Sequence, residues 1–170
     1  MFCQDQILSY ILELKTSVIL PLEILKQSEK KDLHMSHLEV SHDNGIATLT
    51  MNRPEARNAL SMEMRSELCS VLHDIERDAS VRCVVLKGAG DHFMAGGDVK
   101  GMGESIKKPP EEIRKEFMLR IHDLHPIMFA MRRMPKPIIA SCQGAAAGAG
   151  VSMALACDLV IASEDAFFTL

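Results

Sequence analysis

Residues 137–150 constrain the fold of this chain more than any other segment. An apolar run at 138–142 leads into a stretch of glycine and alanine, and an apolar helical segment continues through Ala156. When a strand turns into a helix with only small side chains, the first N–H groups of the helix stay uncovered at the positive end of its dipole. Such a junction either binds an oxygen anion or a polarised carbonyl, or is a tight crossing where only glycine and alanine fit.

Upstream of this segment, the pattern begins with a β-hairpin and a helix. Alternating residues at 38–41 and 46–51 flank Asn44-Gly45, and Asn-Gly between two alternating runs is a strong hairpin signal. Ser61 is placed to cap a helix. The apolar residues of that helix recur at helical spacing and are Met64, Leu68, Val71, Leu72 and Ile75.

Strands and helices continue to alternate toward the C-terminus. Pro109 and Pro110 suit the start of a second long helix, and an apolar stripe from Ile113 to Met128 marks its buried face. Strands that alternate with helices predict an α/β fold whose strands are buried on both faces. The remaining strands are expected at 83–86, 138–142 and 159–162 and from residue 167.

Composition excludes several classes of protein. A chain of 170 residues with 47% hydrophobic content has the length and the core of one domain. A net charge of −4 provides no broad basic surface for nucleic acid. The five cysteines form no CxxC pair, which favours reduced thiols in the cytoplasm over a disulfide framework or a zinc site.

The N-terminal residues 1–34 differ in character from the rest of the chain. Residues 7–25 are apolar, but charged residues and a proline interrupt them, so they do not form a membrane span. They also lack the basic start and the cleavage site of a signal peptide. The segment is either a helical appendage or a mis-assigned leader that precedes a true start at Met35. The second interpretation is favoured because nothing downstream needs the segment, and the domain is expected at 35–170.

Two familiar motifs around residues 148–154 fail on inspection. A dinucleotide-binding GxGxxG turn would need a third glycine where Met153 stands. A hydrolase nucleophile elbow around Ser152 would need a later histidine, but all seven histidines precede it. His122 and His125 lack a third ligand and are expected to be surface residues, so no metal is predicted.

A second loop rich in small residues lies at 93–102. Gly96 and Gly97 follow a predicted strand, and Asp98 is placed to cap a following helix. Alone, this is an ordinary glycine loop. Together with the junction near residue 148, it offers two converging backbone N–H donors, which enolate and acyl-transfer chemistry require at a thioester oxygen.

Four motifs in fixed order make the sequence similar to one family. They are residues 52–54 with 58–60, residues 93–98, residues 135–137 leading to 144–150, and residues 157–159. In this order and at this spacing, they resemble the enoyl-CoA hydratase/isomerase (crotonase) family over about residues 36–170. The resemblance implies a crotonase-like ββα superhelix within the α/β class. It also implies a lyase or isomerase that takes an acyl-CoA thioester as substrate and needs no other cofactor.

The same resemblance assigns roles to five residues of this chain. The backbone N–H groups of Gly97 and Ala149 would form the oxyanion hole, although the family more often has glycine at the second position. Ala95 would lie near the adenine of coenzyme A through its backbone carbonyl. Arg57 and Lys100 would lie near the phosphates of coenzyme A.

The chain departs from the family pattern at the catalytic carboxylates. Hydratases of this family use two glutamates, and Ser152 occupies the position of the first. A serine with no base beside it does not replace a carboxylate in proton transfer near neutral pH. The second glutamate would fall beyond Leu170, so we expect the C-terminal part of the fold to be missing. The full-length parent is expected to form trimers or a dimer of trimers.

Two functions remain open at this point. The first is an acyl-CoA enzyme whose oxyanion hole stabilises a thioester enolate while a carboxylate outside this chain moves the proton. The absence of a glutamate at Ser152 favours isomerase or another enolate chemistry. The alternative is a catalytically silent acyl-CoA-binding or remnant module.

Overall fold

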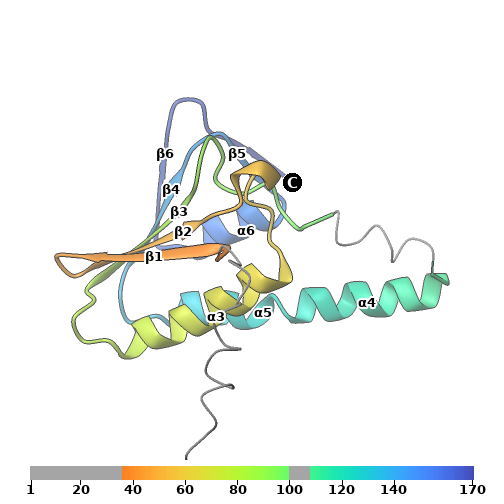
Figure 1. The fold of residues 1–170 in the computed structure, drawn as a ribbon, viewed down its shortest axis with the longest axis horizontal. Helices are drawn as coiled ribbons and strands as arrows, with labels where there is room; N and C mark the ends of the chain where they lie inside the picture. The colour runs from red at the N-terminus through yellow and green to blue at the C-terminus, as the bar shows by residue number, and fades with distance from the viewer. Residues whose placement is uncertain (1–35, 100–107) are drawn as a thin grey trace, which may run out of the picture. The chain divides into compact units, whose positions relative to one another are not determined.

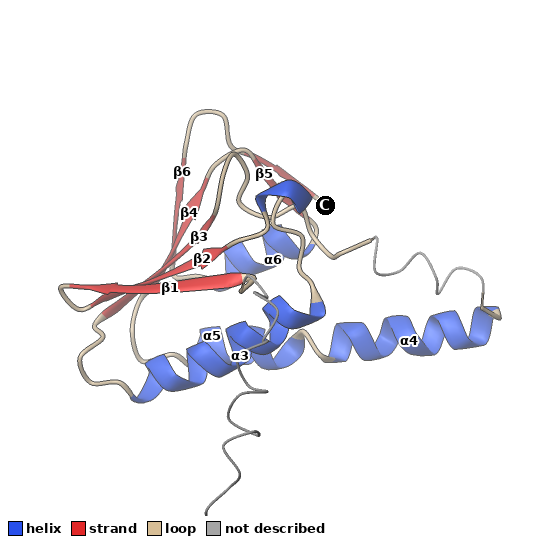
Figure 2. Cartoon of the chain, in the orientation of Figure 1, coloured by secondary structure: helices blue, strands red, loops and turns tan. Residues whose placement is uncertain are grey.

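The computed structural model describes residues 36–99 and 108–170, all within one compact unit, Ser36–Leu170 (Figure 1). The N-terminal segment 1–34 and the proposed start at Met35 lie outside these residues. The strands are β1 (Leu38–Asp43), β2 (Ile46–Met51), β3 (Cys83–Gly88), β4 (Ile138–Cys142), β5 (Ala145–Ala147), β6 (Leu159–Ala162) and β7 (Phe167–Thr169). The helices are a short 3-10 turn η1 (Pro54–Ala56), α3 (Met62–Arg77), α4 (Pro110–His122), α5 (His125–Arg133) and α6 (Ala149–Ala156) (Figure 2).

The main sheet has five strands in the order β1-β2-β3-β4-β6. Strands β1 and β2 pair antiparallel, whereas β3, β4 and β6 each add in parallel. Asn44 and Gly45 turn the hairpin with positive φ angles of 49° and 82°, the conformation that an Asn-Gly turn favours. The hairpin and the alternation of strands and helices are therefore confirmed.

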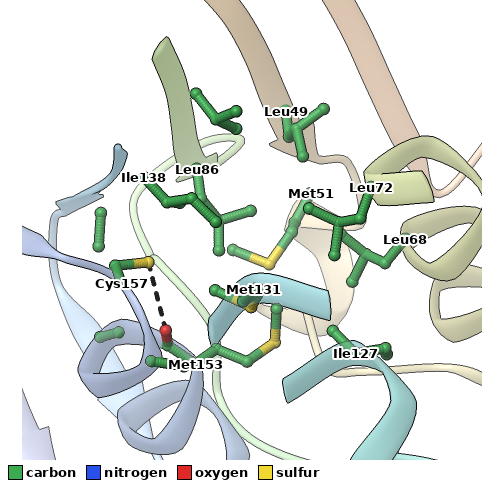
Figure 3. Close-up of a cluster of buried hydrophobic side chains, with 14 of the residues drawn as sticks. Leu49, Met51, Leu68, Leu72, Leu86, Ile127, Met131, Ile138, Met153 and Cys157 are labelled. Carbon is green, nitrogen blue, oxygen red and sulfur yellow. Dashed lines mark hydrogen bonds between the residues drawn. The ribbon is translucent and has the colours of Figure 1, made fainter. Parts of the chain in front are cut away.

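The core lies between the main sheet and helices α3, α5 and α6 (Figure 3). Helix α3 begins where the sequence predicts, because the Ser61 hydroxyl accepts the N–H of Met64 at 3.1 Å. Its apolar face packs toward β2 and α5. The largest fully buried side chains include Leu49, Met51, Met64, Leu68, Leu72, Ile127 and Met153.

A second, two-stranded sheet pairs β5 with β7 in parallel. Strand β5 occupies residues that the sequence analysis expected to be only a turn. Here tertiary pairing overrides the low β-propensity of alanine, since residues 145–147 align both with β7 and with the loop at Met94.

The prediction of one long helix from Pro110 to Met128 is wrong. The segment forms two helices, α4 and α5, which are separated at Asp123 and Leu124. Pro126 explains the break, because it has no N–H to donate to the carbonyl of His122 in a continuous helix. The predicted buried stripe also fails on α4, where none of the residues is buried and Phe117 is 51% exposed.

The expectation that strands are buried on both faces is also wrong for the two outer strands. All four residues of β6 are exposed, and β1 buries only Leu38. None of the helices in the described ranges combines the length and apolar character needed to cross a membrane.

Candidate functional site

The two small-residue loops lie side by side and are joined by backbone hydrogen bonds. The Met94 N–H donates to the Ala145 carbonyl at 3.0 Å, and the Ala147 N–H donates to the Met94 carbonyl at 2.9 Å. The Phe93 N–H also donates to the Gln143 carbonyl at 2.8 Å. The loop after β3 is therefore held against the β4–α6 junction by main-chain pairing.

Gly97 is held in place from the opposite side. The Leu60 N–H donates to the Gly96 carbonyl at 2.8 Å, and the Asp98 N–H donates to the Leu60 carbonyl at 3.3 Å. Gly96 has a φ of +95°, and a methyl group built on it would lie 3.8 Å from the Ala149 nitrogen. The loop at 96–97 thus packs directly against the first residue of α6.

Both predicted oxyanion donors are unused in this arrangement. Among the hydrogen bonds of the described residues, none has the Gly97 N–H or the Ala149 N–H as its donor. Ala149 is the first residue of α6, so its N–H has no intrahelical acceptor. Gly148 precedes it as the N-cap, with a φ of 49° and no side chain to cap the helix.

Gly150 allows the close contact between the two loops. A methyl group at this position would lie only 2.3 Å from the Met94 carbonyl oxygen. Because the obstructing atom belongs to the backbone, it cannot move aside as a flexible side chain could. The interpretation of this segment as a tight crossing is therefore confirmed, and the binding of an oxygen at its uncovered N–H groups stays a prediction.

Buried polar side chains connect the segment 53–60 to the same loops. Asn58 is fully buried; its side-chain oxygen accepts the Arg53 N–H at 2.9 Å, and its amide donates to the carbonyls of Ala89 and His92. The Arg53 guanidinium lies 2.9 Å from the Asp98 carboxylate. Asp98 was predicted to cap a helix, but the residues that would follow it there are outside the described ranges, and its carboxylate pairs with Arg53.

These positioning roles were not foreseen from the sequence. The sequence analysis includes Asn58 and Arg53 only as parts of a motif, and it assigns no role to His92. The Ala145 N–H donates to Nδ1 of His92 at 3.2 Å, which ties the loop after β3 to β5. Asn58 has a positive φ of 56°, and the only sequence signal for its role was the residue type, since asparagine tolerates the left-handed region and bonds to nearby backbone.

A cavity of about 230 Å³ opens beside Gly97. Arg57 and Ala95 line it, and the two residues are directly linked because the Ala95 N–H donates to the Arg57 carbonyl at 2.9 Å. Three of the five residues predicted to bind coenzyme A or its thioester thus line one cavity. Ala149 is not among the residues that line it, and Lys100 lies outside the described residues.

Helix α6 carries no carboxylate. Ser152 is exposed one turn after Ala149, and its N–H donates to the Gly148 carbonyl at 3.2 Å. The described residues also contain no group of three or more His, Cys, Asp or Glu side chains that could hold a metal ion. The site consists of backbone donors and a cavity that is lined by one basic residue, Arg57, and by two acidic residues, Glu55 and Asp98.

Residues 41–170 match the sequence model of the family described as Enoyl-CoA hydratase/isomerase. The chain belongs to the enoyl-CoA hydratase/isomerase family. It is 37% identical over 136 residues to the 1,2-epoxyphenylacetyl-CoA isomerase of Escherichia coli K12, covering 80% of this chain and 49% of that protein. It is 36% identical to the 4-chlorobenzoyl coenzyme A dehalogenase-2 of Arthrobacter, covering 78% of this chain and 47% of that protein.

Solved structures of the enoyl-CoA hydratase/isomerase family confirm the crotonase-like fold. The enoyl-CoA hydratase of Mycobacterium smegmatis superposes with a TM-score of 0.71 at 38% identity, covering 78% of this chain and 49% of that chain. The chain spans about half the length of the curated relatives that it matches. Because those relatives are named for different reactions, membership in the family does not choose among them.

Proposed function

We propose that this protein binds acyl-CoA thioesters and stabilises their enolates through the backbone N–H groups of Gly97 and Ala149. The observation that supports this most is the pair of unused donors, which two hydrogen-bonded loops bring together at the start of α6. A group with two free N–H donors beside a helix N-terminus suits an oxygen on which negative charge develops.

The chemistry follows from where the charge appears. When a proton leaves the carbon next to a thioester carbonyl, the electron pair moves onto the carbonyl oxygen. Donors already aimed at that oxygen need no reorganisation, and each is worth about 2.7–4 kcal/mol of the barrier. Ala149 keeps this ability, because its methyl group does not alter its N–H.

The cavity beside Gly97 suits coenzyme A. Arg57 would pair with phosphate, and the Ala95 carbonyl would accept a hydrogen bond from the adenine. The same 230 Å³ cavity is lined by Arg57, Ala95 and Gly97, so one bound molecule can reach all three. Lys100 follows three residues after Gly97 in sequence and would add a second cation for the phosphates.

The serine at position 152 favours some reactions of the family over others. Addition of water by two glutamates would need the first of them on α6, but α6 carries no carboxylate. Serine is not a base near neutral pH. We therefore favour an isomerase or another enolate reaction over hydration. The proton would be moved by a carboxylate that is not on α6.

The same observation supports a second candidate, a silent acyl-CoA-binding module. A site with donors and a cavity but no base would bind and polarise a thioester without turning it over. Incubation with enoyl-CoA separates the two candidates, because isomerised product requires a proton-transfer group. Tight binding of acetoacetyl-CoA with no conversion of enoyl-CoA would favour the silent module.

Infrared spectroscopy tests the oxyanion hole without requiring turnover. The carbonyl stretch of a ¹³C-labelled acetyl-CoA should move to lower frequency on binding, because both donors polarise the bond. Gly97→Pro removes one N–H and should reduce this shift. Gly97→Ala keeps the N–H and is the matched control, and Gly97 has no positive φ that would exclude alanine. An equal shift in the proline and alanine variants would refute the assignment of Gly97.

A further inference from the structure

Arg65 is a buried cation on α3, and nothing in the proposed mechanism uses it. Arg65 is 8% exposed, and its Nε makes no hydrogen bond. No carboxylate in the described part of the chain forms an ion pair with it. Burying an ionised group without a counter-ion is costly, so the lack of a partner needs an explanation.

A structural role accounts for only one of the hydrogen-bond donors of the Arg65 side chain. One terminal nitrogen of Arg65 donates to the Arg120 carbonyl at 2.7 Å, which satisfies a carbonyl in the last turn of α4. The guanidinium has five N–H donors, and this contact uses one of them. Desolvation lowers the pKa of Arg65, and the nearby Arg120 lowers it further, whereas Asp123 raises it.

Arg65 and Arg120 both line a cavity of about 290 Å³. Two acidic residues also line this cavity, but each lies near another side chain: Asp98 is 2.9 Å from Arg53, and Glu63 is 4.0 Å from His37. Among the described residues, no carboxylate lies within ion-pair distance of Arg65.

This cavity adjoins the thioester site. Asp98 lines both cavities, and Leu60, which lines the second, is paired with Gly97 through the Leu60–Gly97 bridge. An acyl group whose carbonyl oxygen lies at Gly97 would thus begin beside the wall that the two cavities share. A short chain would bring its far end into the cavity of Arg65.

We propose that Arg65, with Arg120, binds a carboxylate at the far end of the acyl group, so that the preferred ligands are coenzyme A thioesters of dicarboxylic acids. This inference rests on the proposed function, since it takes the acyl group to be held at Gly97. A carboxylate fits because the planar guanidinium fork binds it through two parallel hydrogen bonds. It would also supply the buried cation with the anion that the described residues do not provide.

Binding measurements on the whole chain test the inference. Calorimetry would compare succinyl-, glutaryl- and adipyl-CoA with butyryl-, valeryl- and hexanoyl-CoA, which match them in length and end in methyl. At least one carboxylated thioester should bind more tightly than its methyl-ended match. Arg65→Met should weaken that ligand on the order of 10- to 100-fold, the range for a hydrogen-bonded charge, and leave the methyl-ended match unchanged.

Two further variants keep the inference testable even if Arg65→Met fails to fold. Arg120→Met changes a half-exposed residue of α4 and should reduce the same preference, whereas Arg114→Met changes an exposed residue of α4 that does not line the cavity and should not. Thermal unfolding would establish that each variant is folded.

The outcomes are distinct. If methyl-ended and carboxylated thioesters bind alike, the inference fails and the proposed function stands. If Arg65→Met weakens free coenzyme A as much as the carboxylated thioester, Arg65 serves a phosphate and the inference is wrong. If no thioester binds the unmodified chain more tightly than free coenzyme A does, the proposed function fails as well.

Discussion

The loops of the candidate site and helix α4 are built in opposite ways. Around the site, Phe93 and Met94 are fully buried, and the chain is paired through its backbone on both sides. Helix α4 buries none of its residues, and Phe117 and Leu119 are 51% and 54% exposed. Backbone contacts therefore set the positions of the two N–H donors, whereas α4 is joined to the rest of the described chain by few contacts.

Substitutions should therefore have very different effects in the two regions. In the site loops, a single added carbon meets backbone atoms that have no freedom to move. On α4, a whole aromatic side chain can be removed with little loss of packing.

Gly150→Ala should be the most damaging small change. Its methyl group would lie 2.3 Å from the Met94 carbonyl oxygen, so either the loop or α6 must shift. We expect a loss of about 4 kcal/mol or more in the free energy of unfolding, or failure to fold. Ser152→Ala, at an exposed position of the same helix, should change it by less than about 0.5 kcal/mol. Urea unfolding measures both, and a Gly150→Ala protein as stable as the parent would show that the loops are not in contact.

Truncation of a side chain should have unequal effects in the two regions. Leu72 is 2% exposed in the core of α3, and Leu72→Ala should cost about 2–5 kcal/mol. Phe117→Ala removes a larger side chain from α4 but should cost less than about 0.5 kcal/mol. Equal losses in chemical denaturation would mean that α4 is covered in solution, and the contrast between the regions would then be lost.

The ion pair between Arg53 and Asp98 should matter more than a similar pair away from the site. The two side chains are 16% and 21% exposed, and Arg53 also donates to the Ala59 carbonyl at 2.7 Å. Arg53→Met should cost about 1–2 kcal/mol of stability. Arg133, 59% exposed and 3.2 Å from Glu76, provides the matched variant Arg133→Met, which should cost about 0–1 kcal/mol. The idea fails if the two variants melt at the same temperature.

Cys157, buried behind α6, should make stability fall at alkaline pH. The pKa of its thiol is raised from 9.0 to about 12, mainly by burial and to a smaller extent by the nearby Cys142 and Asp158. Between these two pKa values the unfolded chain has lost the proton and the folded chain has kept it, so stability decreases as pH rises. From pH 8 to pH 10 this thiol should account for about 1 kcal/mol.

Cys157→Ala isolates that contribution, because other groups titrate in the same range. The variant should lose less stability than the parent between pH 8 and pH 10. Identical pH profiles would show that the thiol is open to solvent.

Local sequence signals determined much of this protein. The Asn44-Gly45 hairpin, the Ser61 cap and the apolar spacing of α3 are each decided within a few neighbouring residues, and all are present. The ordered motifs at 52–60, 93–98 and 144–150 were also sufficient to identify the family and to choose Gly97 and Ala149 as donors, a choice that the infrared test still has to establish.

Contacts between distant residues decided the remaining features of the fold and the site. The identity of a residue does not reveal which distant residue it will contact. Alanines at 145–147 became β5 only by pairing with β7. Asp98 pairs with Arg53, 45 positions earlier in the numbering of the sequence, and no local pattern indicated this partner. From the sequence, Arg65 is one charged residue on a helix; packing buries it in a cavity with Arg120, where no carboxylate of the described ranges forms an ion pair with it. Local pattern sets most of the elements, whereas pairing and burial between distant residues decide the others and the partners of the buried polar groups.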